Sequence, residues 1–314
     1  LLCGIALWAS FSSGAGATET PLPITPAGGT DIGQALLPPP GLYGGVAVLP
    51  LNENRRFNDA NGNAVDDSQS IKTSIPIIAA GLIYSYPGKI LGGNVISSIQ
   101  LPVFQLDYRI GDGPSNRKRA VGDVYVDLFQ WAKRISGNDG HDALAPPRGL
   151  TVSVGLAMKA PTGNYSRARA LNIGSNVWLT VPNVGMTYRS APLAGVGSDS
   201  EFSARAFYGI PTKNKATNYQ SGHVAAVDFA ATQGMGAWRL GLAGTFGQQV
   251  TDDVRPDGTI PPNGNKSTNL YIGPIISFAS SRSPVVVKLK HFSPVHIRNS
   301  TRQQVVSLVL GFKI

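Results

Sequence analysis

The stretch that most constrains the fold is residues 149–160, where apolar side chains alternate with small or polar ones. Leu150, Val152, Val154, Leu156, Met158 and Ala160 share one parity, and Thr151, Ser153, Gly155, Ala157 and Lys159 share the other. Successive side chains of a β-strand point to opposite faces, so this period of two predicts a strand with one apolar face. The sequence PTGN at residues 161–164 then ends the strand.

A second extended run, residues 176–189, brings the chain back after a polar, basic loop that contains Arg167 and Arg169. The aromatic residues of this run, Trp178 and Tyr188, lie near its two ends. Two strands of this length, joined by a long polar loop, are typical of a transmembrane β-barrel.

Residues 156–189 read LAMKAPTGNYSRARALNIGSNVWLTVPNVGMTYR, with an apolar strand ending in PTG-x-Y, then N-x-G-x-N-x-W, then P-x-x-x-x-T-Y. The positions concerned are Pro161, Thr162, Gly163, Tyr165, Asn172, Gly174, Asn176, Trp178, Pro182, Thr187 and Tyr188. This pattern resembles the outer-membrane transporter family of the "MetA-pathway of phenol degradation". Three more stretches resemble it too, at residues 40–63, 121–134 and 217–253. The resemblance implies an outer-membrane barrel that passes hydrophobic or aromatic compounds.

Composition is compatible with a barrel that faces lipid outside and water inside. Charged residues make up 14% of the 314 residues, against roughly 25% in ordinary soluble proteins, and there are 37 glycines. The net charge of +9 raises the question of nucleic acid. However, the basic residues are scattered apart from one cluster at 117–119, which no nucleic-acid motif surrounds, so we expect no nucleic-acid partner. The cluster fits a basic loop at the membrane surface or a plain solvated loop.

The N-terminal region predicts export. Residues 1–17 combine an apolar segment with small residues ending in Ala-Gly-Ala, so we interpret them as a secretory signal peptide that lacks its start. Cys3 is the one cysteine, so a mature chain would hold no disulfide. Residues 18–40 are rich in Pro and Gly and predict a periplasmic tail, with a plug inside the lumen as the alternative. Residues 41–314 would form the barrel.

Beyond the signal, no stretch approaches eighteen consecutive apolar residues, so no transmembrane helix is predicted. An exported chain without one can span a membrane as a closed barrel. About twelve strands are predicted, at 41–51, 71–86, 94–110, 121–134, 149–160, 176–189, 201–210, 223–231, 238–250, 268–280, 284–293 and 303–314. Long polar loops, such as 52–70 and 251–267, alternate with mostly shorter connections, as in outer-membrane barrels.

The last strand alternates as well, with Val306, Leu308, Leu310, Phe312 and Ile314 on one parity. Outer-membrane proteins usually end on such a strand with a terminal aromatic residue, whereas this chain ends on Ile314 with Phe312 two residues before it. We therefore expect the barrel-assembly machinery of the outer membrane to be a partner. An ordinary sheet strand is the alternative.

If the apolar faces meet lipid, the charged residues of the strands point into the lumen. Arg or Lys facing lipid at mid-membrane would cost about 2–4 kcal/mol, so the strand that carries Lys288 and Lys290 must turn both inward. The lumen and solute-path candidates are Asp123, Asp127, Lys159, Arg205, Asp228, Arg239, Lys288 and Lys290, with Lys313 on the last strand. Each could guide a solute or simply pack the lumen.

The sequence predicts a channel rather than an enzyme. It holds no GxSxG, no HExxH and, after the signal, no cysteine nucleophile, and residues 59–63 fail the EF-hand pattern, so we predict no catalytic residue, metal or cofactor. The predicted function is passive passage of small hydrophobic or aromatic solutes through the outer membrane of a Gram-negative bacterium. Two alternatives remain open: a soluble exported all-β binding or adhesion domain, and an outer-membrane hydrolase.

Overall fold

The computed structural model describes residues 23–66, 71–137, 148–169, 171–279 and 285–314. The signal peptide predicted at residues 1–17 lies outside these ranges. The strands are β1 (Gly41–Asn58), β2 (Ile71–Ser74), β3 (Ile77–Ser85), β4 (Asn94–Ile110), β5 (Asn116–Val121), β6 (Val124–Arg134), β7 (Gly149–Ala160), β8 (Leu179–Ser190), β9 (Asp199–Pro211), β10 (Val224–Met235), β11 (Trp238–Gln249), β12 (Thr268–Ala279), β13 (Val285–Arg298) and β14 (Ser300–Lys313). Two short 3₁₀ turns, η2 (Leu193–Gly195) and η3 (Pro262–Asn265), lie in connections.

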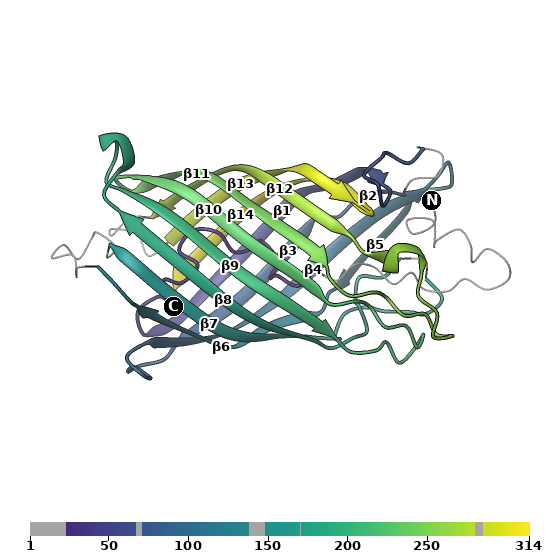
Figure 1. The fold of residues 1–314 in the computed structure, drawn as a ribbon, viewed down its shortest axis with the longest axis horizontal. Coiled ribbons are helices and arrows are strands. Elements are labelled where there is room, and N and C mark those ends of the chain that lie inside the picture. The colour runs from purple at the N-terminus through teal and green to yellow at the C-terminus, as the bar shows by residue number, and fades with distance from the viewer. Residues whose placement is uncertain (1–22, 67–70, 138–147, 170, 280–284) are drawn as a thin grey trace.

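All strands pair antiparallel with their neighbours and form a closed barrel (Figure 1). The barrel closes where β14 pairs with β1, with Ala47 opposite Val309. β2 and β3 together make one wall strand because both pair with β1 and β4. β5 and β6 likewise follow each other along β4. Counted this way, the barrel has twelve strands, as predicted.

The predicted facing of the strands is also confirmed. On β7 the residues of the Val154 parity lie outward, whereas Ser153 on the other parity is buried inside. Val184 on β8 and Leu242 on β11 are each 56% exposed on the outer wall, where lipid covers them. Because the apolar faces point outward from a closed barrel, the alternative of a soluble sandwich with an apolar core is excluded.

Some strand ends differ from the prediction. β1 continues to Asn58, through residues predicted as loop, and β13 and β14 extend to Arg298 and from Ser300. Asn58 pairs with Ser300 across the β1–β14 seam. The extension depends on backbone hydrogen bonds, which do not require apolar side chains. The sequence pattern therefore marked the lipid-covered part of these strands and missed their polar continuation beyond the membrane.

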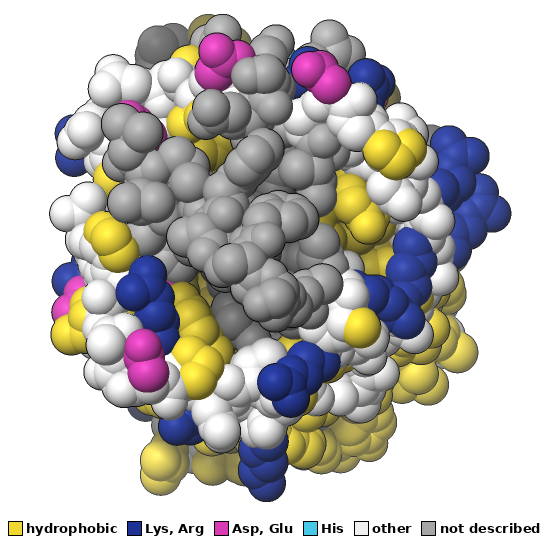
Figure 2. Space-filling view, turned by 90° about the vertical axis from the view of Figure 1, so that its right-hand side faces the viewer, with side chains coloured by type: hydrophobic (Ala, Val, Ile, Leu, Met, Phe, Trp, Pro, Cys, Tyr) yellow, Lys and Arg dark blue, Asp and Glu magenta, His cyan; other side chains and the backbone are white. Residues whose placement is uncertain are grey.

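The two ends of the barrel are different. One end carries the long connections that follow β1, β7, β9 and β11. The other end carries the short turn 236–237, the start of β1 and the end of β14. Lys and Arg side chains stand at several places around the rim of the long-loop end (Figure 2). By the usual orientation of such barrels, the long loops are external. No helix in the described part of the chain is long and apolar enough to cross a membrane.

Residues 23–40, which we call the luminal segment, lie inside the barrel. Lys159 near the external end donates a hydrogen bond to the carbonyl of Pro23 at 3.4 Å. Ser85 near the other end donates to the carbonyl of Pro38 at 2.8 Å. Ala35 has no exposed surface at all. The described part of the predicted tail is thus a plug that runs along the lumen.

The preference for a tail was wrong for a physical reason. The sequence of the luminal segment lacks a periodic apolar face, and such a face was taken as the condition for burial. The lumen of this barrel is polar, so burial there requires hydrogen bonds and charge pairs instead. Backbone groups of a Pro- and Gly-rich chain can supply those bonds without any periodic pattern.

Candidate functional site in the barrel lumen

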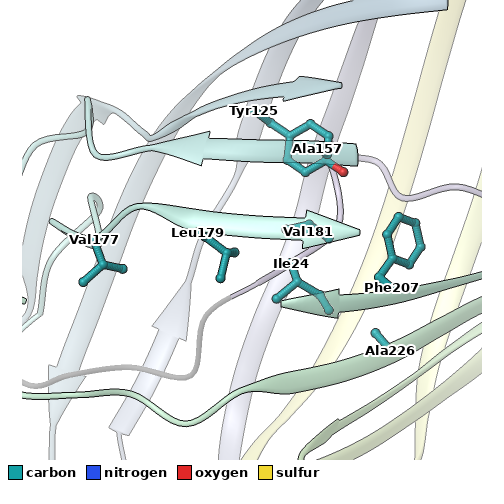
Figure 3. Close-up of a cluster of buried hydrophobic side chains, with 8 residues drawn as sticks. All are labelled: Ile24, Tyr125, Ala157, Val177, Leu179, Val181, Phe207 and Ala226. Atoms are coloured by element: carbon teal, nitrogen blue, oxygen red, sulfur yellow. The ribbon is translucent and has the colours of Figure 1, made fainter. Parts of the chain in front are cut away.

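An apolar patch of the lumen wall, which we call the apolar collar, packs against the start of the luminal segment near the external end. Its wall residues are Tyr125, Ala157, Val177, Leu179, Val181, Phe207 and Ala226, contributed by β6 to β10 and the loop before β8. Ile24 of the luminal segment packs among them and is 3% exposed (Figure 3). The collar is therefore an apolar surface on the part of the lumen wall that β6 to β10 form.

Glycine makes room for Ile24 at the collar. A Cβ at Gly209 on β9 would lie 2.5 Å from Cγ2 of Ile24, closer than real side chains approach. The absence of a side chain at Gly209 thus lets the luminal segment lie directly against the strand. The hydroxyl of Tyr125 is buried in the same collar and has no hydrogen-bond partner among the described residues.

Below the collar the lumen is charged, and the first pair is Arg205 with Asp127. The Arg205 guanidinium lies 3.0 Å from a carboxylate oxygen of Asp127 and also donates to Asn183. Ser98 donates a further bond to Asp127 at 2.6 Å. Arg205 also sits 5.0 Å from the centre of the Phe207 ring, a cation–π contact that joins the charged zone to the collar.

The next level ties the luminal segment to β10 and β13. Thr30 donates to Asp228 through both its backbone amide, at 3.0 Å, and its hydroxyl, at 2.7 Å. Asp31 accepts from Lys288 at 2.7 Å and from Lys290 at 2.9 Å. Asp31, Asp228 and Lys290 are buried, so these contacts stabilise the segment in place.

A third cluster lies toward the periplasmic end and centres on Glu201. Its carboxylate accepts from Arg189 at 2.6 Å and from the backbone amide of Gly33 at 2.6 Å. Arg239 pairs with Asp199 and lies 3.8 Å from Glu201. Glu201 is 1% exposed, so the lumen is filled by protein at this level.

The structure brings six of the eight predicted lumen residues into these three levels: Asp127, Arg205, Asp228, Arg239, Lys288 and Lys290. Asp123 has a different role, because its carboxylate accepts from the backbone amides of Gly163 and Ser175 and so anchors the loop between β7 and β8. Lys159 lies beside it, 3.9 Å from Asp123, and contacts the luminal segment at Pro23.

Sequence reasoning missed several charged lumen residues and the residues of the apolar collar. Arg189, Asp199 and Glu201 lie at strand ends, where facing was not assigned, and Asp31 lies in the segment predicted as a tail. The collar was missed because lumen faces were expected to be polar. A usable signal existed on β8, where Leu179 and Val181 share the inward parity of Asn183 and Arg189.

The basic cluster at residues 117–119 lies on β5, away from the lumen network. Arg117 pairs with Asp107 at 2.6 Å on an exposed surface, and Lys118 donates to Asn164 in the neighbouring loop. Its side chains therefore have partners on β4 and in the loop between β7 and β8. Within the described residues, no group of three or more His, Cys, Asp or Glu side chains is placed to hold a metal ion.

A family model described as "Putative MetA-pathway of phenol degradation" matches residues 54–296, most of the chain. The chain belongs to this family. The family match confirms the resemblance found in the hairpin of β7 and β8. No curated protein matches the sequence.

Among solved structures, this chain is similar to the COG4313 outer membrane channel from Pseudomonas putida F1. The TM-score is 0.74 at 13% identity, covering 91% of this chain and 100% of that one. It is also similar to the transport unit of the autotransporter AIDA-I from Escherichia coli, with a TM-score of 0.49, 11% identity and coverage of 87% and 89%. At 13% identity the likeness to the Pseudomonas channel concerns the fold, which is that of an outer-membrane β-barrel.

Proposed function

We propose that the protein is a passive channel in the outer membrane of a Gram-negative bacterium for small hydrophobic or aromatic compounds. The observation that carries this proposal is the apolar collar, which places Tyr125, Leu179 and Phe207 at the external end of a lumen with charged groups below it. An apolar surface of this kind favours a solute that gains free energy by leaving water, about 1.5–3 kcal/mol for a body the size of a Phe side chain.

The luminal segment is the barrier that solute has to pass. It fills the lumen in the described conformation, so passage requires that part of it moves aside. Ile24 occupies the collar and is held there by packing, whereas Thr30, Asp31 and Gly33 are held by hydrogen bonds and charge. An entering apolar solute would replace Ile24 within the collar first, and this exchange costs little because one apolar contact substitutes for another.

The similarity to a solved outer membrane channel supports a transport role over an enzymatic one. No observation favours the hydrolase alternative. The outward apolar parity of β14 supports recognition of the last strand by the barrel-assembly machinery, and the apolar outer wall supports lipid as the surrounding partner.

The proposal is tested by uptake of radiolabelled toluene into intact cells. Deletion of the gene should lower uptake, and the wild-type gene should restore it. Val181→Asn places an amide in the collar and should restore uptake only in part, while Val250→Asn, at an exposed position beside the external loops, should restore it fully. Equal uptake with and without the gene, for toluene and for other hydrophobic solutes, would exclude the proposed function.

A further inference from the structure

The pairing of Asp31 with Lys288 and Lys290 has the geometry of a carboxylate in a binding site. Each lysine contacts a different oxygen of the same carboxylate, Lys288 at 2.7 Å and Lys290 at 2.9 Å. Residues two apart on a strand share one face, so β13 presents both ammonium groups to the same point of the lumen. Asp31 is 2% exposed and Lys290 is 4% exposed, which makes this a desolvated charge-assisted contact.

The two lysines form their salt bridges with the luminal segment rather than with the barrel wall. The wall carboxylate of Asp228 lies near enough to Lys290 for an electrostatic attraction, but it accepts hydrogen bonds from the amide and hydroxyl of Thr30. If Asp31 moves away with the segment, both lysines lose their direct carboxylate contact and one of the two positive charges is left without a counter-charge, which is unfavourable in a site of low water content.

An apolar site adjoins the two lysines. Ile32, the next residue of the luminal segment, packs against the buried cluster of Ala230, Ala243 and Ile275, and Phe292 packs against the same cluster. The Lys290 ammonium lies 5.1 Å from the centre of the Phe292 ring. Asp31 and Ile32 together thus present a carboxylate joined to a compact apolar group, lying beside a phenyl ring.

We propose that Lys288, Lys290 and the apolar surface at Phe292 form a binding site for a small aromatic carboxylate, which Asp31 and Ile32 occupy in the closed channel. A solute such as benzoate would place its carboxylate between the two lysines and its ring in the space of Ile32. The solute would then stabilise the displaced position of the luminal segment, because its carboxylate replaces that of Asp31 at the two lysines. This inference rests on the proposed channel function and specifies one class of its solutes.

The test is the binding of benzoate to the full-length protein in detergent micelles, measured by isothermal titration calorimetry, with neutral benzamide as the matched ligand. Asp31→Asn removes the competing internal carboxylate, so benzoate should bind this variant about tenfold or more tighter than wild type. Benzamide should show no such gain. Adding Lys288→Gln and Lys290→Gln to Asp31→Asn should abolish benzoate binding, because this triple variant removes both lysine charges together with that of Asp31.

Two exposed lysines of the loop between β9 and β10 provide the control. Lys213→Gln with Lys215→Gln, made in the Asp31→Asn background, removes the same amount of charge away from the lumen and should leave benzoate binding unchanged. The retained folded state of every variant is checked by its shifted gel migration without heating. Equal binding of benzoate and benzamide to Asp31→Asn, or full benzoate binding by the triple variant, would overturn the proposed site.

Uptake of neutral toluene separates this inference from the proposed function. Toluene carries no charge for the lysines, so its uptake reports on the channel alone. If toluene uptake depends on the gene but benzoate binding does not depend on the lysines, the carboxylate site is wrong and the channel stands. If benzoate binds as expected but no neutral solute enters, the site stands and the broader proposal fails.

Discussion

Ile24 of the luminal segment lies directly against Gly209 of β9, so closely that a Cβ at Gly209 would come within 2.5 Å of Cγ2 of Ile24. This contact fixes where the barrier enters the apolar collar. It also means that the closed state depends on the absence of one side chain from the barrel wall. The position of the barrier can therefore be altered from the wall without changing the luminal segment itself.

Replacing Gly209 by Val should open the channel. The new side chain cannot coexist with Ile24 in its present place, so we expect the start of the luminal segment to be displaced and the ion conductance in planar bilayers to rise. Gly247→Val is the matched control, because the position of a Cβ at Gly247 has no atom within 4 Å. Unchanged conductance in the Gly209 variant, with the barrel intact, would show that Ile24 does not limit passage.

The buried pair of Arg205 and Asp127 should contribute strongly to barrel stability. Asp127→Asn leaves the Arg205 charge buried and should lower the free energy of unfolding by about 3–5 kcal/mol, measured by urea titration in micelles. Arg117→Gln breaks the ion pair with Asp107, in which the Arg117 side chain is 70% exposed. This change should lower the free energy of unfolding by only about 0–1 kcal/mol. Equal losses in the two variants would contradict the buried role assigned to Arg205.

Charge on the outer wall should be costly only where lipid covers it. Val184 at the middle of β8 is 56% exposed and Ile260 in the loop after β11 is 57% exposed, so the two differ in surroundings rather than in accessibility. We expect Val184→Arg to destabilise the barrel folded in a bilayer by about 2–4 kcal/mol. Ile260→Arg should have almost no effect, and a similar cost for both would place Val184 outside the membrane.

Tyr125→Phe should be neutral or stabilising. The Tyr125 hydroxyl is buried without a hydrogen-bond partner in the described part of the chain, so removing it relieves a desolvation cost of about 1–3 kcal/mol. Leu179→Ala in the same collar should instead destabilise by about 2–5 kcal/mol, because it leaves a cavity. The stability of each variant is measured as the temperature at which the folded, compact band is lost on a gel. A marked loss of stability in Tyr125→Phe would reveal a partner for the hydroxyl.

Much of the barrel could be predicted because the alternation of apolar and polar residues along a strand shows which face contacts lipid. A charge facing lipid is so unfavourable that Lys288 and Lys290 could be assigned to the lumen from their strand alone, and the structure places both there. The same rule predicts inward positions for Arg205, Asp127 and Asp228, all of which are buried in the structure. It did not assign Arg189 and Glu201, because the ends of strands lie where alternation stops being enforced by lipid.

The partners inside the lumen could not be predicted in the same way. The contacts of Asp31 with Lys288 and Lys290 join residues more than 250 positions apart, and no local pattern relates them. The polar extension of β1 to Asn58 was missed for a similar reason, since its partners on β14 are brought to it only by closure of the barrel.

The sequence by itself determined that this chain forms a barrel of about twelve strands, which residues face lipid and which family it belongs to, because a two-residue period and a lipid boundary act locally along each strand. Only the tertiary structure decided that residues 23–40 fill the lumen, that Ile24 lies in an apolar collar and that Asp31 occupies the two lysines of β13. Those outcomes depend on side chains and backbone groups that come into contact across the closed barrel. Closure of the barrel brings these groups together, so no single segment of the sequence predicts their contacts.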